Sequence, residues 1–313
     1  MSKNEAAVRL EWHNWAPARA GHGEQLMYTE HYGLREKPFS LTPDPRFLFL
    51  SASHREALAH VLYGIDQGEG FIAVTGEVGT GKTTLCRTLI DRLGAETEVA
   101  YLFNPALDPD ELLCAVALEY DIRAVGLGRA ELNDRLNRFL LDASASGRRV
   151  LLIVDEAQNL STETLEQMRL LSNLETARSK LIQIVLFGQP ELDEKLDSKE
   201  LRQLRQRISV RWRLGSLSEA EAREYVRHRV RVAAGDEREL FTPSALREIR
   251  RRARGIPRLV NLLADRSLLA GYAEGAYRVS GSHVGQAARE ILSARRTGSG
   301  WRRVSLARGK GVL

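Results

Sequence analysis

The stretch Phe71-Ile-Ala-Val-Thr-Gly-Glu-Val-Gly-Thr-Gly-Lys-Thr-Thr84 decides the fold of this chain. Its first five residues are typical of a buried strand, and Gly76-x4-Gly81-Lys82-Thr83 then matches the phosphate-loop pattern without a mismatch. Glycines let the backbone curl until several N–H groups point inward and form an anion nest at the start of a helix. We therefore expect nucleotide phosphates to bind at Gly76, Glu77, Val78, Gly79, Thr80, Gly81, Lys82, Thr83 and Thr84.

The side chains of this loop have separate expected roles. Lys82 brings a positive charge to the β- and γ-phosphates, and the Thr83 hydroxyl is placed to ligate Mg²⁺. The alternative is a glycine-rich turn without a ligand, which does not usually stand between an apolar strand and an amphipathic helix. Such a helix follows here, with apolar residues at helical spacing at Leu85, Leu89, Ile90 and Leu93.

Length and composition limit the class of protein. The 313 residues can form one large α/β domain and a smaller partner. A hydrophobic content of 43% and a charged content of 28% are ordinary for a soluble globular protein. The longest aliphatic run, at 150–154, is too short for a membrane helix, and the first residues hold no apolar signal core. Cys86 and Cys114 have no metal-ligand or disulfide spacing, so we expect a reducing, cytoplasmic compartment.

A second strand ends on two acids. The run Arg148-Arg-Val-Leu-Leu-Ile-Val-Asp-Glu156 is typical of a central parallel strand that ends at the carboxyl edge of a sheet, where ligands bind. We expect Asp155 to hold the Mg²⁺ that Thr83 also touches, and Glu156 to orient and deprotonate the attacking water. Many strands end on acids, so this assignment depends on the phosphate loop upstream.

Two further segments offer candidate site residues. The strand at 181–187 leads into Gly-Gln-Pro-Glu-Leu192, where the Gln189 amide could reach the γ-phosphate or the water; a turn-forming glutamine is the open alternative. Arg202, Arg205 and Arg207 cluster before a strand at 208–212. A solvated helix face or a surface ion pair is the common role of such arginines. A ring-forming ATPase would take from here an arginine that reaches a neighbour's γ-phosphate.

The periodicity predicts four parts of the chain. Residues 1–27 are expected to be a disordered extension, with Met27 as an alternative translation start, and 28–215 an α/β nucleotide-binding domain. Residues 216–294 are expected to be an all-helical domain, and 295–313 a basic flexible tail. The expected fold class is α/β, a central parallel five-stranded sheet with helices on both faces plus the C-terminal helical domain.

Two details concern the flanks of this sheet domain. A strap at 32–51 with three prolines within 38–45 cannot be helical, and is expected to wrap the nucleotide base or simply to pack. Pro257 stands in the first turn of a predicted helix at 257–273, with Arg258 and Asn261 one turn apart. Arg258 could therefore fold back toward the phosphates.

In this order the motifs resemble an AAA+ ATPase of the P-loop superfamily, and more specifically the ATPase module of the general secretion pathway protein A (ExeA-like) family. The resemblance covers about residues 28–292. It rests on Tyr32-Gly-Leu-Arg-Glu-Lys-Pro-Phe39, Asp44-Pro-Arg-Phe47, His54-Arg-Glu-Ala-Leu58, Gly76–Thr84, Val154-Asp-Glu-Ala-Gln158, Gly188-Gln-Pro-Glu-Leu192, Leu201-Arg-Gln-Leu-Arg-Gln-Arg-Ile208 and Gly255-Ile-Pro-Arg-Leu-Val-Asn261.

The resemblance implies ATP as the nucleotide, hydrolysed with water to ADP and phosphate. It makes 76–84 the Walker A loop, and Asp155 and Glu156 the Walker B acids. Gln189 lies at the sensor 1 position, where many AAA+ proteins have asparagine.

The resemblance also implies that subunits act together. Arg207 best matches the arginine-finger position, with Arg205 as the second candidate. Arg258 matches the sensor 2 arginine of the lid, which is the all-helical domain expected here at 216–294. We expect a homo-oligomer when ATP is bound, either a hexameric ring or a filament.

Three functions remain open at this point. The first is a motor or switch ATPase that assembles a secretion, pilus or envelope polysaccharide system through a protein partner. Founding members of the family continue into a membrane helix and a periplasmic peptidoglycan-binding domain, and this chain has neither, so it is expected to be cytoplasmic and at most peripheral to the inner membrane. The second is a DNA-binding transposition helper, suggested by 250–254 and by six Arg or Lys residues after Ala294. The third is a nucleotide-gated scaffold with negligible hydrolysis.

Overall fold

The computed structural model describes residues 27–298 apart from 43, 104 and 176–179, and side chains only as far as 291. The chain forms two compact units. Leu50–Gly215 form the first, and the described residues before Leu50 and after Gly215 form the second. The predicted disordered extension at 1–27 and basic tail at 295–313 lie almost entirely outside the described residues.

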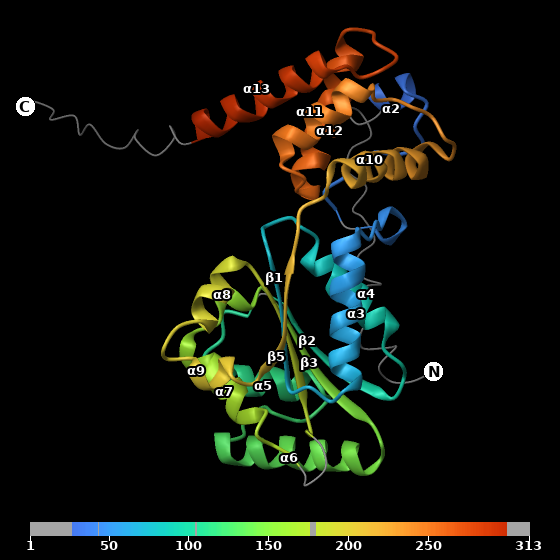
Figure 1. Cartoon of the computed structure of the whole chain (residues 1–313). Helices are drawn as coiled ribbons and strands as arrows, with labels where there is room; N and C mark the ends of the chain where they lie inside the picture. Colours follow the sequence, from blue (N-terminus) through green and yellow to red (C-terminus); the bar gives the residue numbers. More distant parts are fainter. Residues whose placement is uncertain (1–26, 43, 104, 176–179, 299–313) are drawn as a thin grey trace, which may run out of the picture. The chain divides into compact units, whose positions relative to one another are not determined.

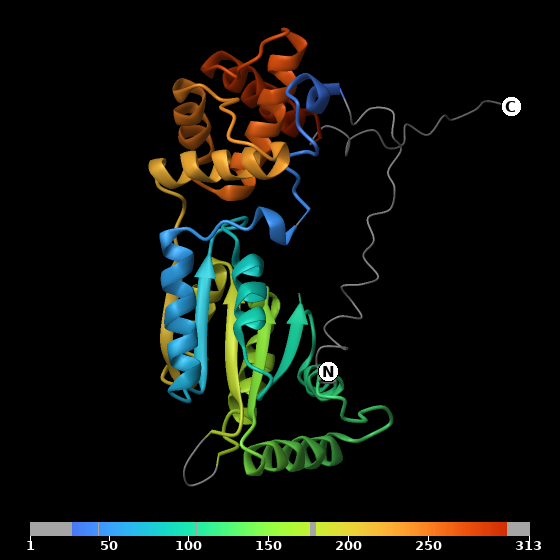
Figure 2. The ribbon, with the colours of Figure 1, turned by 90° about the vertical axis from the view of Figure 1, so that its right-hand side faces the viewer.

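The first unit is built on a five-stranded sheet (Figures 1 and 2). Its strands are β1 Phe71–Gly76, β2 Thr97–Phe103, β3 Arg149–Asp155, β4 Gln183–Gly188 and β5 Ile208–Leu214. They lie in the order β2-β3-β4-β1-β5, and every neighbouring pair is parallel. The predicted fold class is confirmed, and the carboxyl ends of all five strands meet at one edge of the sheet.

Helices cover both faces of this sheet (Figure 1). Side chains along a strand point alternately to the two faces, so Ile72 and Val74 of β1 pack on one side and Phe71 and Ala73 on the other. The first side is covered by α3 Ala52–Asp66 and α4 Lys82–Arg92. The second is covered by α5 Pro109–Glu119, α6 Arg129–Ala145, α7 Thr162–Leu171, α8 Pro190–Leu196 and α9 Arg202–Arg205.

The short helices α8 and α9 were not predicted. The sequence predicts only a strand end at 188–192, where the structure has Gln189 as the N-cap of α8 and Pro190 in its first turn. Proline suits this position because the first helical N–H groups have no partner within the helix. Seven residues are too few for the periodicity test that finds longer helices.

The second unit is helical. Its helices are α2 Met27–His31, α10 Glu219–Ala234, α11 Pro243–Ala253, α12 Pro257–Ala273 and α13 Gly281–Gly298, with a 3-10 turn, η1, at Pro45–Phe47. Ser218 and Glu221 form a capping box at the start of α10, and the Thr242 side chain caps α11. No helix of the described residues is both long enough and apolar enough to span a bilayer.

The proline-rich strap belongs to this helical unit, whereas the sequence predicts it as part of the α/β domain. Its apolar side chains Leu34, Phe39 and Phe47 are buried in one core with α10, α11 and α12. The physical reason is that an extended segment without its own hydrogen-bonded structure takes its place from the surface that buries its apolar side chains. That surface is formed by helices about 190 residues later in the chain.

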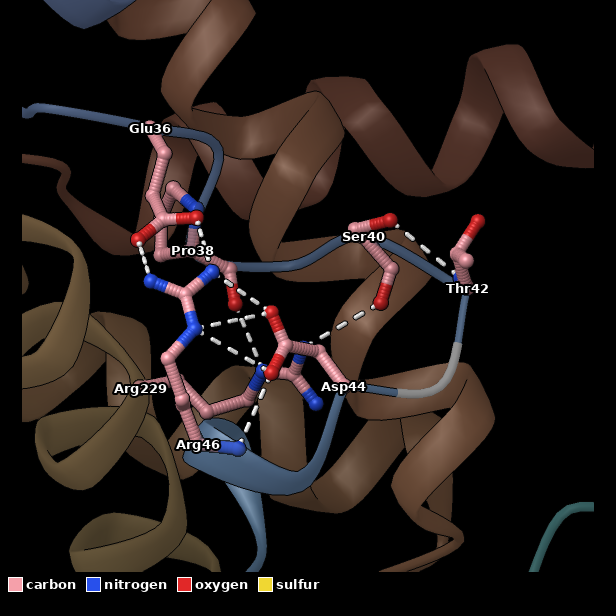
Figure 3. A network of polar contacts seen from close by, with 7 residues as sticks. All are labelled: Glu36, Pro38, Ser40, Thr42, Asp44, Arg46 and Arg229. Atoms are coloured by element: carbon pink, nitrogen blue, oxygen red, sulfur yellow. Dashed lines mark hydrogen bonds and ion pairs between the residues drawn. The ribbon is translucent and has the colours of Figure 1, made fainter. Parts of the chain in front are cut away.

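One buried arginine joins the strap to α10 (Figure 3). Arg229 donates from Nε to the Pro38 carbonyl (2.5 Å), from Nη2 to the Ser40 carbonyl (3.2 Å) and from Nη1 to the Tyr225 hydroxyl (3.0 Å). Its guanidinium carbon lies 4.8 Å from the centre of the Phe47 ring. We call this group of contacts the Arg229 junction.

Within the strap, Arg46 closes a second set of contacts. Its guanidinium donates to both carboxylate oxygens of Glu36 at 2.8 Å and also to Asp44 (Figure 3). The Asp44 side chain also caps η1 by accepting from the Arg46 N–H. These side chains are largely exposed, so the ion pairs themselves contribute little stability.

Candidate active site

The phosphate loop runs from the end of β1 to the start of α4. β1 ends at Gly76 and α4 begins at Lys82, with Gly81 as its N-cap. Gly81 has a φ of +101°, a conformation that only glycine adopts readily. A methyl group on Gly81 would also lie 2.7 Å from His54 Nε2. The loop therefore requires glycine here for two reasons, its backbone conformation and the close approach of α3.

His54 supports the loop from α3, and sequence reasoning gave it no role. Its Nε2 lies 2.9 Å from the Thr80 carbonyl, and its Nδ1 lies 2.6 Å from Ser51 Oγ. A carbonyl only accepts, so Nε2 carries the proton, and in the neutral ring Nδ1 accepts from the serine hydroxyl. The buried His54 thus holds the loop backbone next to Gly81.

Lys82 is a buried cation at the base of the loop. Only 5% of its surface is exposed, and Nζ donates to the carbonyls of Gly76 (2.7 Å) and Glu77 (3.2 Å). Burial lowers the Lys82 pKa, and the nearby carboxylates of Glu156 and Asp155 act against that shift. Two neutral carbonyls replace only part of the solvation of an ammonium, so an anion that enters the loop gains a strong partner.

Thr83 and Asp155 lie side by side. The Thr83 hydroxyl donates to Asp155 Oδ2 (2.7 Å), and the Glu156 N–H donates to Oδ1 (2.9 Å). Asp155 has no exposed surface, and its burial raises its pKa in spite of these two donors.

These oxygens fit Mg²⁺. The ion prefers oxygen ligands and usually takes few from the protein, with the rest from phosphates and water. Among the described residues no group of three or more His, Cys, Asp or Glu side chains could hold a metal. Thr83 and Asp155 therefore suit an ion that arrives with a phosphate ligand.

Glu156 stands beside two glutamine amides. Its Oε2 accepts from Gln158 Nε2 (2.6 Å) and from Gln189 Nε2 (2.8 Å). The Gln189 amide therefore lies beside Glu156, and Gln189 also occupies the N-cap position of α8, where its side chain makes no capping hydrogen bond. Its expected role at the γ-phosphate stays a prediction. Gln158 belongs to the motif Val154-Asp-Glu-Ala-Gln158, but the sequence does not predict a role for it. Residues in a turn after a strand have no periodicity that shows where their side chains point.

Arg207 and Arg205 lie at the opposite edge of the sheet. Arg207 precedes β5, whose first residue pairs with Phe71, while the last residue of β5 pairs with Gly76. The Arg207 guanidinium lies 3.4 Å from Ser172 Oγ, and Arg205 lies 3.9 Å from the Asp197 carboxylate. The structure thus brings Lys82, Thr83, Asp155, Glu156 and Gln189 together but leaves both arginines away from them.

Arg258 is an exposed residue in the first turn of α12, in the helical unit. Asn261, one turn later, is buried and accepts a hydrogen bond from the Tyr225 hydroxyl (2.9 Å). Although Arg258 and Asn261 lie one turn apart on α12, Arg258 is therefore exposed to solvent whereas Asn261 is buried. The expected role of Arg258 at the phosphates stays a prediction.

Comparison with known proteins finds a matching family model, a relative of similar sequence and solved structures of similar fold. A family model described as an AAA domain matches residues 65–196. General secretion pathway protein A of Aeromonas hydrophila is 47% identical over 277 residues, which cover 87% of this chain and 50% of that protein. The chain thus spans about half the length of this curated relative.

Solved structures with this fold include two ORC proteins. Drosophila ORC bound to DNA matches with a TM-score of 0.64 and 16% identity, over 97% of this chain and 77% of that one. The Aeropyrum pernix ORC2 protein in its ADPNP-ADP complexes matches with a TM-score of 0.58 and 19% identity, over 81% and 71%. At these identities the likeness shows the fold alone. Residues 65–196 of this chain thus match an AAA domain, its fold is that of these solved structures, and its sequence is similar to General secretion pathway protein A.

Proposed function

We propose that this chain is a Mg²⁺-dependent ATPase that hydrolyses ATP to ADP and phosphate between subunits of a homo-oligomer. The observation that carries the proposal is the meeting of Lys82, Thr83, Asp155 and Glu156 at one sheet edge. A lysine for phosphate charge, an oxygen pair for the metal and a carboxylate for water are the parts that phosphoryl transfer to water needs.

Each side chain has a task in the proposed reaction. The loop N–H groups and Lys82 bind the β- and γ-phosphates, and Thr83 and Asp155 would hold Mg²⁺. When bound, the ion neutralises phosphate charge. Glu156 accepts a proton from the water that attacks the γ-phosphate in line. The Gln189 amide is close enough to Glu156 to help orient that water.

The sheet register supports the proposed involvement of a second subunit. Arg207 precedes Ile208, which pairs with Phe71, whereas the loop begins at Gly76 at the other end of β1. A strand of seven residues is about 20 Å long, so Arg207 is too far along the sheet to reach phosphates in its own loop. We propose that it reaches a neighbour's γ-phosphate in a ring or filament, with Arg205 as the second candidate, and that Arg258 of the lid adds charge at the phosphates.

The arginine proposal has a direct test in mixed oligomers. Arg207→Ala subunits keep an intact loop, and Lys82→Ala subunits keep an intact arginine. Each variant alone is expected to lose most ATP turnover, and a mixture is expected to regain part of it, because some sites combine the intact halves. Turnover that Arg207→Ala leaves unchanged would exclude this arginine, and the same mixture with Arg205→Ala would test the other.

The pathway is the least constrained part of the proposal. The name of the relative supports a role in a secretion pathway. We propose that the client is a secretion, pilus or envelope polysaccharide system that the ATPase helps to assemble. We propose that hydrolysis takes place in the cytoplasm, beside the inner membrane, where lid movement would remodel a protein partner.

The DNA-binding alternative rests on the arginines at 250–254 and on the six Arg or Lys residues after Ala294. Arg251 and Arg252 both pair with Glu248, which reduces the net positive charge of that helix face. The test is DNA binding measured from low to physiological salt, with and without ATP. ATP-dependent binding with a steep salt dependence would favour this alternative.

Hydrolysis itself is tested by Glu156→Gln, which keeps the shape of the side chain and removes the base. We expect ATP to bind with nearly unchanged affinity and turnover to fall at least about 100-fold. The matched control is Glu194→Gln, an exposed glutamate on α8, which should hydrolyse as the wild type does. Wild-type protein that binds ATP without turnover would instead favour the nucleotide-gated scaffold.

A further inference from the structure

Gln158 is a bridge between the proposed base and α8. It lies in the 3-10 turn η2, Ala157–Asn159, which directly follows Glu156. Its Nε2 donates to Glu156 Oε2 (2.6 Å), and its Oε1 accepts from the Gln189 N–H (3.0 Å). A carboxylate only accepts and a backbone N–H only donates, so both partners require the same orientation of the amide.

The backbone around Gln158 is held by the same helix. Lys195, in the last turn of α8, donates from Nζ to the carbonyls of Gln158 (2.5 Å) and Leu160 (2.8 Å). The side chain and the backbone of Gln158 thus both contact α8, at its first and its last turn. A residue held at both ends can keep a neighbouring group in one position.

Glu156 needs such support because its backbone is unusual. Its φ is +56°, a left-handed conformation that residues other than glycine seldom adopt. Such conformations persist where the surrounding contacts enforce them, and they are frequent at functional sites. The contacts that hold Glu156 are the amides of Gln158 and Gln189 on its side chain and Asp155 on its N–H.

The two oxygens of the Glu156 carboxylate differ. Oε2 accepts both amide hydrogen bonds, whereas Oε1 accepts none from the residues that the structure describes. A carboxylate held through one oxygen presents the other in a fixed direction.

We propose that Gln158 is a positioning residue for the hydrolysis proposed above: it holds Oε2 so that Oε1 accepts the proton of the attacking water. The inference rests on that proposed function. Gln189 is expected to turn its amide toward a bound γ-phosphate, whereas the side-chain oxygen of Gln158 keeps it on the α8 backbone. Gln158 therefore continues to hold Glu156 during the reaction.

The test is Gln158→Met in the full chain, because methionine has nearly the same length and no donor. Loss of a group that orients a catalytic residue commonly costs roughly 10- to 100-fold. We expect kcat to fall by that factor while the affinity for ATP and ADP changes less than about twofold, since Gln158 contacts neither the loop nor Lys82.

The matched control is Gln183→Met. Gln183 is buried at the opposite end of the sheet, and its Nε2 donates to the carbonyls of Ile65 and Glu69. This variant should lower thermal stability and leave kcat unchanged. Gln158→Met with wild-type kcat would overturn the inference, as would a loss of nucleotide affinity parallel to the loss of kcat.

A second comparison separates positioning from a general structural effect. If Gln158 acts through Glu156, adding Gln158→Met to Glu156→Gln should not lower the residual single-turnover rate further. A further fall of tenfold would contradict the inference and leave the proposed function standing. Absence of turnover in the wild type, by contrast, overturns the proposed function and the inference together.

Discussion

Lys82 and Arg229 are both buried cations, yet their surroundings differ. Lys82 is 5% exposed and donates to two carbonyls of its own loop, five and six residues away. Arg229 is 7% exposed, donates from all three guanidinium nitrogens, and stacks on Phe47. Its carbonyl partners lie 191 and 189 residues away in the chain.

The difference suggests that Lys82 is available to bind a ligand, whereas Arg229 holds the structure of the helical unit together. Lys82 is incompletely solvated by its neutral partners, and its lowered pKa reflects the cost of holding the charge there. An arriving phosphate relieves that cost, so the charge is available for binding. Arg229 has a partner on every side, so its charge is committed to holding the strap on α10.

Among the substitutions that test this difference, the largest expected effect is on nucleotide binding. Lys82→Met should weaken ATP binding at least about 100-fold, equivalent to about 3 kcal/mol, because it removes the charge that meets the phosphates. Stability of the nucleotide-free protein should stay level or rise, since a poorly solvated charge is removed. Titration with a fluorescent ATP analogue and thermal unfolding measure the two effects, with Lys180→Met, an exposed lysine of the same unit, as the control. A large loss of stability would contradict the contrast with Arg229.

The second effect is on the helical unit. Arg229→Met should lower the free energy of unfolding by about 2 kcal/mol, because the Pro38 and Ser40 carbonyls lose their donor. Hydrogen exchange should become faster over residues 34–49. Arg227→Met on the same helix is the control: Arg227 is exposed and pairs with Glu224 and Glu239, so its loss should cost no more than about 0.5 kcal/mol. Equal effects of the two substitutions on the free energy of unfolding would contradict the prediction that the Arg229 junction stabilises the helical unit.

The smallest expected effect on stability concerns Asp155, whose charge is also held at a cost. Asp155→Asn should raise the melting temperature of the nucleotide-free protein by about 2 °C, while Mg²⁺-dependent ATP binding is lost.

The sign of its pH dependence follows from the raised pKa. Between the ordinary value of 3.8 and the raised value, folded Asp155 keeps a proton that the unfolded chain has released. The stability contributed by this group is therefore lost as the pH rises through that window, and the full cost is present once the pH exceeds the raised pKa. The advantage of Asp155→Asn over the wild type should narrow as the pH is lowered from about 7 toward 4. An advantage that widens on acidification would contradict a raised pKa.

The edge of the sheet that holds the candidate site was largely predictable. Phosphate-loop residues are neighbours in the chain, so their spacing alone places Lys82 and Thr83 at the start of α4. Asp155 and Glu156 end a strand of five aliphatic residues, and parallel strands bring such ends to the edge where the loop lies. The same geometry brought Gln189 to the site at the end of β4.

Residues that contact the site from turns and distant helices were not predictable in this way. His54 reaches Thr80 from a helix 26 residues earlier, and Lys195 reaches η2 from 35 and 37 residues later. Neither lies in a pattern that indicates a partner. The strap was assigned to the wrong unit for the same reason, because its prolines exclude a helix but do not say which surface buries Phe39 and Phe47.

The sequence by itself determined the parallel α/β sheet and the phosphate loop with its two acids, because those features depend on residues that are close in the chain or on one repeated strand period. Only the tertiary structure decided how Glu156 is held by Gln158 and Gln189, and how Arg229 holds the strap. Those contacts join segments that the chain separates, and hydrogen bonds of this kind depend on the final packing of side chains and not on local preference.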